Sequence, residues 1–404
     1  MVKTHTLSNG VRIVSDPMPF TRSVSIGIWI HVGSRHEPSH LSGMAHFVEH
    51  MLFKGTASRS ARDIAEQFDR IGGQINAFTT KEYTCLHAKV IDTHANQALE
   101  ILADMFFHSQ FLTADIEKEK QIIYEEIKMY EDTPDELVHD LLMEAAYPEQ
   151  AFGRSILGSE QTVSTFTAKT VSEFQRNTYQ PQRVVISVAG HYSPEFITEI
   201  GESFSSFPSM ESDICLHEEA IFTPKQINRQ KETEQTHVCF GFEAVSSQSE
   251  AIYPLAIVNN LLGGSMSSRL FQHIREDRGL AYSVYSYFST YEDQGLFTIY
   301  AGVANDQLDE LKEAIEYNVR QLVLHGITLD ELAAQKEQLK GHILLSSEGT
   351  DSRMEQNGKN ELLLGQPQTV ESFISRLEAV TFDELHRFVE QCLTKEPAIA
   401  IVSP

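Results

Sequence analysis

The feature that most constrains this chain is the segment Gly43–Gly55, which contains the pattern His-x-x-Glu-His among apolar residues. The apolar neighbours predict a short helix that is largely buried. On such a helix His46 and His50, four residues apart, lie on one face and can direct both imidazoles to one point. Glu49 lies beside them, where a carboxylate can take a proton from a metal-bound water. These buried polar side chains need partners, and a divalent metal ion is the simplest partner for all of them.

The alternative for this segment is an ordinary helix with two hydrogen-bonded histidines and a solvated glutamate. The choice depends on a third ligand, and the segment 113–130 offers one. Its inward face is predicted from residues at i, i+3, i+4 and i+7 spacings, namely Ile116, Glu119, Ile122, Ile123, Glu126, Ile127 and Tyr130. Two carboxylates therefore point to the interior, where they must be neutralised, paired or metal-bound.

Glu126 is the predicted third ligand, because it completes a His-His-Glu set with an open position for water. Glu119, two turns earlier on the same face, is predicted to contact one of the metal ligands, not the metal itself, and to orient that ligand. Glu125 is the alternative ligand, but it lies about 100° away around the helix, on the side where Lys118 and Lys128 point outward. An ordinary charged helix, with glutamates paired to neighbouring lysines, is the structural alternative.

Turn signals and periodicity predict a mixture of strands and helices in the first half of the chain. The predicted strands are 4–7, 11–14, 23–32, 74–80, 83–90 and 183–190, and an Asn9-Gly10 turn joins the first two. Besides the two segments above, helices are predicted over 60–71 and 95–107.

The second half repeats features of the first. Thr328–Leu332 opens a long helix as Thr113–Ile116 does, and each half ends in a short apolar strand, 184–188 and 398–402. We therefore predict an α+β fold of two homologous α/β sandwich domains, each a mostly antiparallel sheet covered by helices.

The predicted boundaries are 1–207 for the N-terminal domain, 208–224 for an acidic, irregular linker and 225–404 for the C-terminal domain. The C-terminal half has no His-x-x-Glu-His, so only the first domain is expected to bind metal. Its Gly263-Gly264 pair lacks the Lys-Ser/Thr of a phosphate loop and is interpreted as a helix-entry turn.

Composition narrows the class of protein. The formal charge of −25 argues against nucleic-acid binding and favours cationic ligands, although it serves solubility equally well. No apolar run of about 18 residues is present, so no membrane span is predicted. Cys85, Cys215, Cys239 and Cys392 are far apart in sequence and are interpreted as reduced thiols of a cytoplasmic protein. The N-terminal residues also lack the apolar core of a secretory signal.

At these residues the chain resembles the pitrilysin-like inverzincin metallopeptidases, in particular the branch with bacterial processing peptidases and the mitochondrial processing peptidase β-subunit. That family inverts the His-Glu-x-x-His spacing of the commoner zinc peptidases. The resemblance runs nearly end to end. It is carried by Gly43–Thr56, by Asn76–Thr79, by Glu119 and Glu126, and by the stretches 183–190 and 275–284.

For the first half, the resemblance implies that His46, His50 and Glu126 bind one Zn²⁺ per chain. It further implies that Glu49 is the catalytic base and that Glu119 is a supporting carboxylate. The strand 74–79 would be the edge to which an extended peptide adds as a further strand.

On that edge strand the resemblance implies three substrate-binding residues, Asn76, Ala77 and Phe78. In the second half it implies that Arg275 and Tyr282 hold substrate and stabilise the tetrahedral oxyanion. Without the resemblance, Arg275 is better explained as a surface residue paired with Glu276 or Asp277, and Tyr282 as a packed strand residue.

Members of this family with one such pair of domains generally form dimers. The resemblance therefore implies a homodimer that encloses a chamber, with Arg275 and Tyr282 delivered to the zinc of the other chain. The predicted function is a zinc-dependent endopeptidase that hydrolyses unfolded or extended peptides. The alternatives are a non-catalytic peptide-binding or structural subunit of the same fold, and a metal-binding protein without turnover.

Overall fold

The computed structural model describes residues 2–208 and 218–404, which form two compact units. Within the described residues, unit 1 contains 2–127, 155–208 and 346–369, and unit 2 contains 128–154, 218–345 and 370–404. Each unit therefore takes one segment from the other half of the chain. Of the predicted linker 208–224, residues 209–217 lie outside the described residues, as does Cys215.

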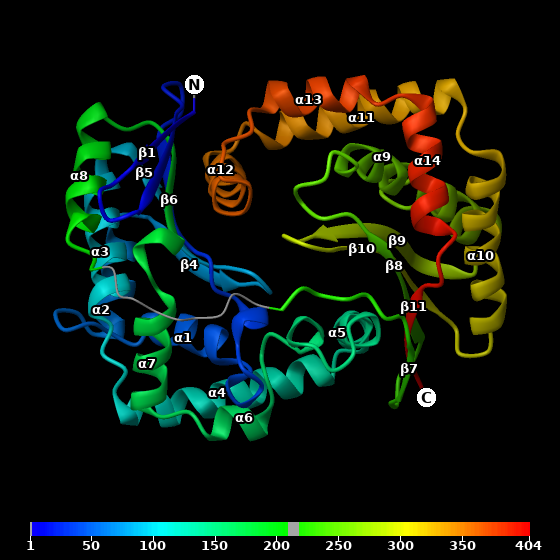
Figure 1. The fold of residues 1–404 in the computed structure, drawn as a ribbon. Coiled ribbons are helices and arrows are strands. Elements are labelled where there is room, and N and C mark those ends of the chain that lie inside the picture. Colours follow the sequence, from blue (N-terminus) through cyan, green and yellow to red (C-terminus); the bar gives the residue numbers. More distant parts are fainter. Residues whose placement is uncertain (1, 209–217) are drawn as a thin grey trace. The chain divides into compact units, whose positions relative to one another are not determined.

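Unit 1 is built on a six-stranded sheet with the order β1-β2-β6-β3-β5-β4, in which only β2 and β6 are parallel. Its strands are β1 (Lys3–Thr6), β2 (Arg12–Pro17), β3 (Ser23–Ile30), β4 (Gln74–Thr79), β5 (Thr84–Ile91) and β6 (Val184–Gly190). The helices of the first half are α1 (Met44–Leu52), α2 (Ala61–Arg70), α3 (Ala95–His108), α4 (Thr113–Glu131), α6 (Glu160–Ser164), α7 (Ala168–Thr178) and α8 (Pro194–Ser205). Alternate residues of β3, such as Ile26 and Ile28, pack with residues of these helices in one apolar core. Figure 1 shows the course of the sheet and of the helices.

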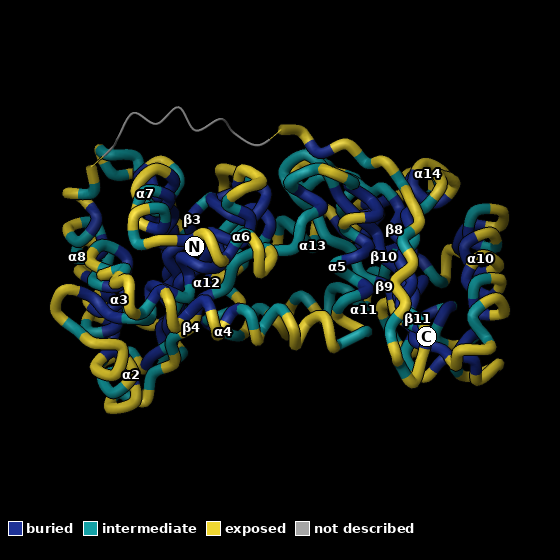
Figure 2. Tube along the Cα trace, turned by 90° about the horizontal axis from the view of Figure 1, so that it is seen from below, coloured by how far each residue is buried: buried dark blue, intermediate teal, exposed yellow. Residues whose placement is uncertain are grey.

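Unit 2 is built on a five-stranded sheet with the order β7-β11-β8-β10-β9, in which only β7 and β11 are parallel. Its strands are β7 (Gln226–Gln230), β8 (Thr236–Ala244), β9 (Ala281–Thr290), β10 (Gly295–Val303) and β11 (Ala398–Ser403). Its helices include α9 (Ile252–Leu262), α10 (Leu308–His325), α11 (Leu329–Ser346), α13 (Val370–Ala379) and α14 (Phe382–Leu393). In both units the strands are mostly buried and the exposed residues gather on the outer sides of the helices (Figure 2).

The two sheets have the same topology once β1 is set aside. Strands β2, β6, β3, β5 and β4 of unit 1 correspond in order and direction to β7, β11, β8, β10 and β9 of unit 2. The predicted duplicated α+β fold is therefore confirmed. No helix in the described part of the chain is long and apolar enough to cross a membrane.

Two helices are exchanged between the halves of the chain. Helix α5 (Pro134–Ala146) follows α4 but packs on β8 and β11 of unit 2. Helix α12 (Thr350–Leu364) follows α11 but packs on β3 and β6 of unit 1. Each exchanged helix covers the sheet face that the other helices leave open. The predicted boundaries at 1–207 and 225–404 differ from the two units by these segments, because sequence order does not show which sheet a helix covers.

Helix α12 is held on unit 1 by polar contacts around a small apolar cluster. Arg353 and Asn357 both donate to the buried carboxylate of Asp16, at 2.7 and 3.0 Å. Ser187 Oγ donates to the backbone carbonyl of Met354 at 2.7 Å. The side chain of Met354 packs in the cluster that contains Trp29. Partners this specific fix one orientation of the helix on the sheet.

The predicted inward face of α4 is too wide. Ile116, Glu119 and Ile123 are buried as expected, but Ile122 is 49% exposed and Tyr130 is 38% exposed, so both predictions are wrong. Ile122 lies about 100° around the helix from Ile123, beyond the stripe that contacts the core. Tyr130 lies beyond residue 127, where the contribution of α4 to unit 1 ends.

Two glycines in helices provide a test of the packing under α12. A methyl group at Gly358 would overlap the indole of Trp29, whereas a methyl group at Gly341 of α11 has no neighbour within 4 Å. We expect Gly358→Ala to lower the free energy of unfolding by about 1–3 kcal/mol through overpacking. The matched variant Gly341→Ala should raise it by about 0.5–1 kcal/mol through helix propensity. Urea denaturation measures both, and effects of the same sign would contradict the packing described.

Candidate metal centre

Three predicted ligands converge in unit 1. His46 Nε2 lies 3.7 Å from Glu126 Oε1, and His50 Nε2 lies 3.7 Å from Glu126 Oε2. One donor atom from each residue lies within 4.8 Å of the other two, and these three residues are the only such group in the part of the chain that the structure describes. Glu125, the alternative ligand, is exposed and outside this group.

The residues present fit a zinc ion. Two imidazole nitrogens and a carboxylate oxygen are a donor set that zinc prefers, and donor atoms around a tetrahedral zinc lie about 3.3–3.6 Å apart. One donor atom from each residue lies within 4.8 Å of the other two, so closure of the side chains by about an ångström would bring the three to these separations. Glu126 Oε2 is buried and has no hydrogen-bond partner in the described residues. A buried carboxylate oxygen without a donor is costly, and a cation would satisfy it.

The pKa values of the three predicted ligands are shifted in different directions. Burial, with a contribution from neighbouring His50, lowers the pKa of His46 to about 3. Burial alone would lower the pKa of His50 as well, but its hydrogen bond to Glu119 and the nearby carboxylates raise it overall. Burial raises the pKa of Glu126, and the charge of Glu119 adds to this effect.

Glu119 lies behind His50, as the sequence predicts. Its Oε1 is 2.8 Å from His50 Nδ1 and its Oε2 is 2.6 Å from Lys54 Nζ. Burial alone would raise the pKa of Glu119, but these two partners outweigh burial and lower it. A carboxylate on the second ring nitrogen fixes the tautomer of His50, so that Nε2 is free to bind a metal.

Glu49 points into the same region and is almost completely buried. Its Oε2 accepts a hydrogen bond of 2.5 Å from the hydroxyl of Thr79, the last residue of β4. Burial raises the pKa of Glu49, and the hydrogen bond from Thr79 only partly opposes the rise. A raised pKa brings the carboxyl group closer to the range in which a general base works at neutral pH.

Helix α1 begins against a buried carboxylate that sequence analysis does not single out. The backbone N–H groups of Gly43 and Ala45 donate to Glu37 at 2.8 and 2.6 Å. Negative charge at a helix N-terminus satisfies free amides and complements the helix dipole. Gly43 has a φ of 94°, and a side chain there would collide with the carbonyl of Leu157. Glu37 was missed because it is six residues from Gly43, outside the usual capping positions.

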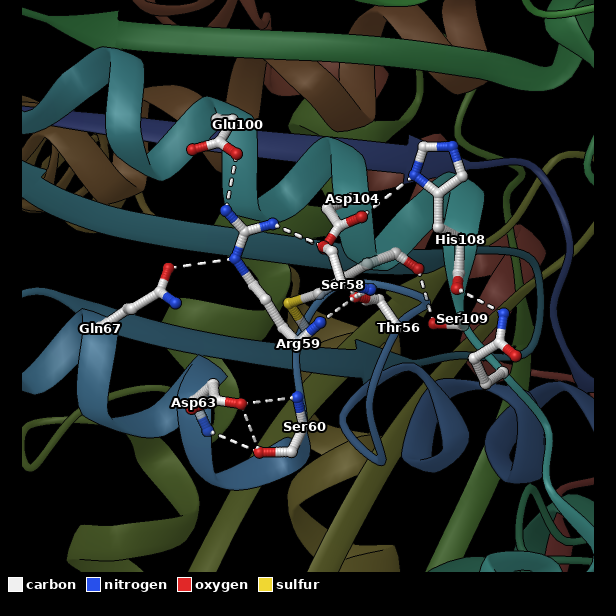
Figure 3. Close-up of polar contacts among 12 residues, drawn as sticks. Thr56, Ser58, Arg59, Ser60, Asp63, Gln67, Glu100, Asp104, His108 and Ser109 are labelled. Atoms are coloured by element: carbon white, nitrogen blue, oxygen red, sulfur yellow. Dashed lines mark hydrogen bonds and ion pairs between the residues drawn. The ribbon is translucent and has the colours of Figure 1, made fainter.

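The chain that leaves α1 is anchored on α3. Thr56 and Ser58 donate to Asp104 at 2.7 and 2.9 Å, and Arg59 forms ion pairs with Asp104 and Glu100 at 2.7 and 2.6 Å (Figure 3). These donors lower the pKa of Asp104 although burial alone would raise it. Both ends of α1 are therefore held by carboxylates, which fixes where its histidines point.

The predicted substrate strand β4 is the last strand of its sheet. It pairs with β5 only, within the described residues. The backbone N–H of Ala77 donates to Oδ1 of Asn76 at 2.9 Å, so this N–H faces away from β5 toward the open edge. The ring of Phe78 packs edge-on against Trp29, with centroids 5.7 Å apart, so its side chain is part of the cluster under α12.

Arg275 and Tyr282 are neighbours in unit 2. The guanidinium of Arg275, in the helical segment Phe271–Asp277, lies 4.6 Å from the ring centroid of Tyr282 and 4.7 Å from that of Phe271. Arg275 also pairs with Glu276 at 3.6 Å, the surface pairing that its sequence neighbours suggest. Tyr282 is the second residue of β9 and is 78% exposed, so its phenol is accessible within this unit.

The edge of β9, which corresponds to β4, is partly blocked. The backbone N–H of Ser286 donates to the carbonyl of Gly263 at 3.1 Å, and a side chain at Gly263 would collide with Ser286. Gly263 is the C-cap of α9, so the glycine pair ends a helix and the predicted helix-entry turn is wrong. Close approach to a strand explains why glycine is needed there.

Comparisons with known proteins agree with this architecture. Residues 12–160 match the family model described as Insulinase (Peptidase family M16), and residues 165–339 match the model described as Peptidase M16 inactive domain. A Bacillus subtilis protein named uncharacterized zinc protease YmxG is 52% identical over 404 residues, covering 100% of this chain and 98% of that protein. The Streptomyces coelicolor protein named uncharacterized zinc protease SCO5738 is 37% identical, covering 100% of this chain and 90% of that protein.

Solved structures show the same fold. A protease from Helicobacter pylori superimposes with a TM-score of 0.93 at 21% identity and covers 100% of this chain and 99% of its own. A structure from Pseudomonas fluorescens, described as a peptidase M16 inactive domain, superimposes with a TM-score of 0.92 at 18% identity, covering 100% and 98%. At these identities the similarity establishes the fold alone.

Zinc binding to the metal-free protein is expected to release protons below about pH 7, and fewer of them as the pH rises. The pKa values of His50 and Glu126 are raised, and both groups bind metal in their deprotonated forms. His46, with a pKa of about 3, contributes no proton in this range. The affinity should therefore rise with pH, by about tenfold per unit for each displaced proton below the relevant pKa. Calorimetry in two buffers of different ionisation enthalpy counts the protons, and heats independent of buffer would contradict this expectation.

Proposed function

The chain belongs to the M16 family of zinc proteases, and we propose that it is a zinc-dependent endopeptidase acting on unfolded or extended peptides. The predicted resemblance to the pitrilysin-like peptidases is thereby confirmed at the level of the family. The observation that carries the proposal is the convergence of His46, His50 and Glu126 beside the buried Glu49. In this proposal the first three residues bind one Zn²⁺ per chain and Glu49 is the general base.

When bound, zinc acts as a Lewis acid and lowers the pKa of a coordinated water toward 7. Glu49 would take one proton from the attacking water molecule as the water oxygen bonds to the carbonyl carbon of the peptide. Glu49 then gives that proton to the amine nitrogen as the carbon–nitrogen bond breaks, so the carboxylate is restored. Its raised pKa suits both transfers. Glu119 holds His50 in the tautomer that leaves Nε2 unprotonated.

An extended peptide can reach this region by adding to the edge of β4. An edge strand offers unpaired backbone groups, and a peptide that pairs with them must itself be extended and unfolded. The outward N–H of Ala77 is one such group, and the carboxamide of Asn76 would turn aside to release it. Phe78 contributes its backbone, since its ring is packed against Trp29.

Arg275 and Tyr282 are proposed to hold the substrate and stabilise the oxyanion of the tetrahedral intermediate. A cation and a phenol are suitable donors for developing negative charge. The rings that flank Arg275 hold its guanidinium in place, and Tyr282 is accessible. We propose that they act in a homodimer that encloses a chamber, each pair serving the zinc of the other chain.

The alternative of a non-catalytic subunit is less well supported. A subunit that only binds peptides has no need of a buried carboxylate beside a potential metal site, because such a group is costly to bury. Both Glu49 and the complete ligand set are present. The free, buried thiols of Cys85, Cys239 and Cys392 fit a reducing compartment, which supports the cytoplasm as the proposed location.

Removal of the base tests the proposed mechanism. Glu49→Gln keeps the shape of the side chain but cannot accept a proton, so we expect peptide hydrolysis to fall by about 10²–10⁴-fold with zinc still bound. His46→Ala is expected to abolish both zinc binding and hydrolysis. A quenched fluorescent peptide measures the rate and elemental analysis measures the metal. Undiminished cleavage by metal-loaded Glu49→Gln would refute the role of Glu49.

Complementation tests the shared site. His46→Ala and Arg275→Ala chains are each expected to be inactive alone. If the site is shared in trans, a mixed dimer contains one intact site, so random exchange should restore about a quarter of the wild-type activity. If both residues serve the zinc of their own chain, each site in the mixed dimer keeps one defect. No recovery after verified exchange would therefore place the site within one chain.

A further inference from the structure

We propose that Thr79 is a positioning residue. Its hydroxyl holds the carboxylate of Glu49, the proposed general base, in a fixed position relative to β4, the proposed substrate strand. This inference rests on the proposed function. It assigns to Thr79 a role that its sequence context does not reveal, because a threonine at the end of a strand is ordinary. The residue belongs to β4, whereas the carboxylate that it contacts belongs to α1.

The direction of the hydrogen bond is determined by its surroundings. Thr79 Oγ1 lies 2.5 Å from Glu49 Oε2 and 3.3 Å from Thr84 Oγ1. The hydroxyl proton of Thr84 is already donated to the backbone carbonyl of Val32 at 2.9 Å. A hydroxyl has one proton to give. An ionised carboxylate has no proton and only accepts, so Thr79 donates its proton to Glu49 over the shorter of its two contacts. Thr84, whose proton goes to Val32, does not donate to Thr79.

This bond is the main constraint on Glu49. The residue Glu49 is 8% exposed, and Thr79 is its only side-chain hydrogen-bond partner in the described part of the chain. A hydroxyl that donates to a carboxylate at such a distance forms a strong, charge-assisted bond. The bond leaves Oε1 as the oxygen available to a water molecule. Loss of the hydroxyl would let the carboxylate rotate without changing any of the three proposed ligands.

The same residue lies on the edge that would receive the substrate. Side chains and outward backbone groups recur every second residue along a strand, so Thr79 presents its backbone to the same edge as Ala77. A peptide added to β4 would therefore run past the residue that holds the base. The distance between the peptide backbone and Glu49 is then set by β4 itself.

The turn that follows β4 is held by several contacts, which keep Thr79 in a fixed position. The hydroxyl of Thr80 accepts from the backbone N–H groups of Glu82 and Tyr83, at 3.2 and 3.1 Å. The backbone carbonyl of Thr80 accepts from Ser34 at 3.1 Å. Arg35 pairs with Glu82 at 2.6 Å, and both side chains are about 1% exposed. A turn fixed by a buried ion pair and several backbone contacts holds Thr79 in one place.

Two matched variants separate the hydroxyl from the rest of the side chain. Thr79→Val keeps the branched shape and the strand propensity but removes the donor, whereas Thr79→Ser keeps the donor and removes a methyl group. In zinc-loaded dimers we expect Thr79→Val to lower kcat about 10–100-fold, the usual effect of losing a supporting hydrogen bond. KM for an extended peptide should change less than about threefold, and Thr79→Ser should recover most of the lost kcat.

A second readout distinguishes positioning from damage to the metal site. Each variant is loaded with Co²⁺ in place of zinc, and its visible absorption spectrum reports the ligand geometry. We expect one metal per chain and the wild-type spectrum in both variants. A crystal structure of Thr79→Val should show the carboxylate of Glu49 turned from its wild-type position.

Several outcomes would overturn the proposal. They are a wild-type kcat in Thr79→Val, an equal loss in both variants, an altered cobalt spectrum, or an unmoved Glu49 in the crystal structure of Thr79→Val. Failure of the proposed function gives a different result, since the zinc-loaded wild type would then not cleave peptides at all.

Discussion

The structure depends on one electrostatic constraint, the placing of several carboxyl groups and two imidazoles in a largely buried region. Glu49, Glu119 and Glu126 lie around the histidines of α1. Burial leaves the pKa of Glu49 and Glu126 raised, whereas His50 and Lys54 outweigh burial at Glu119 and lower its pKa. Like charges gathered in one buried region repel strongly because water is scarce there. Lys54 and Thr79 each satisfy one carboxylate, and a divalent cation would satisfy Glu126. The surrounding fold serves to hold these groups together.

Two features of the duplicated fold make the two halves chemically different. The first sheet ends in an accessible strand, β4, beside the proposed metal site, whereas the corresponding edge of β9 is contacted by Gly263. The first half has the histidines, and the second half has an arginine held between two aromatic rings. The exchange of α5 and α12 means that each sheet needs both halves of the chain to cover its second face. Neither half of the sequence therefore forms its unit alone.

Local patterns predicted most of the elements well. The alternation of apolar residues located β3, and Ser60 with Gly72 delimited α2. The inward face of α4 was drawn too wide at Ile122, because periodicity alone does not say how much of a helix touches the core. The roles of Glu37 and Thr79 could not be predicted, since each acts on a residue distant in sequence through a contact that only folding creates.

The amino-acid sequence was enough to predict the duplicated α+β class, the helix that places His46 and His50 on one face, and the position of Glu126, rather than Glu125, on the side of α4 that faces them. These follow from periodicities of two and 3.6 residues, which are properties of the backbone. The folded chain was needed to show which helix covers which sheet, which strand edge is open and which hydroxyl contacts Glu49. These features depend on contacts between residues far apart in the chain, and local sequence patterns do not predict which distant residues will meet.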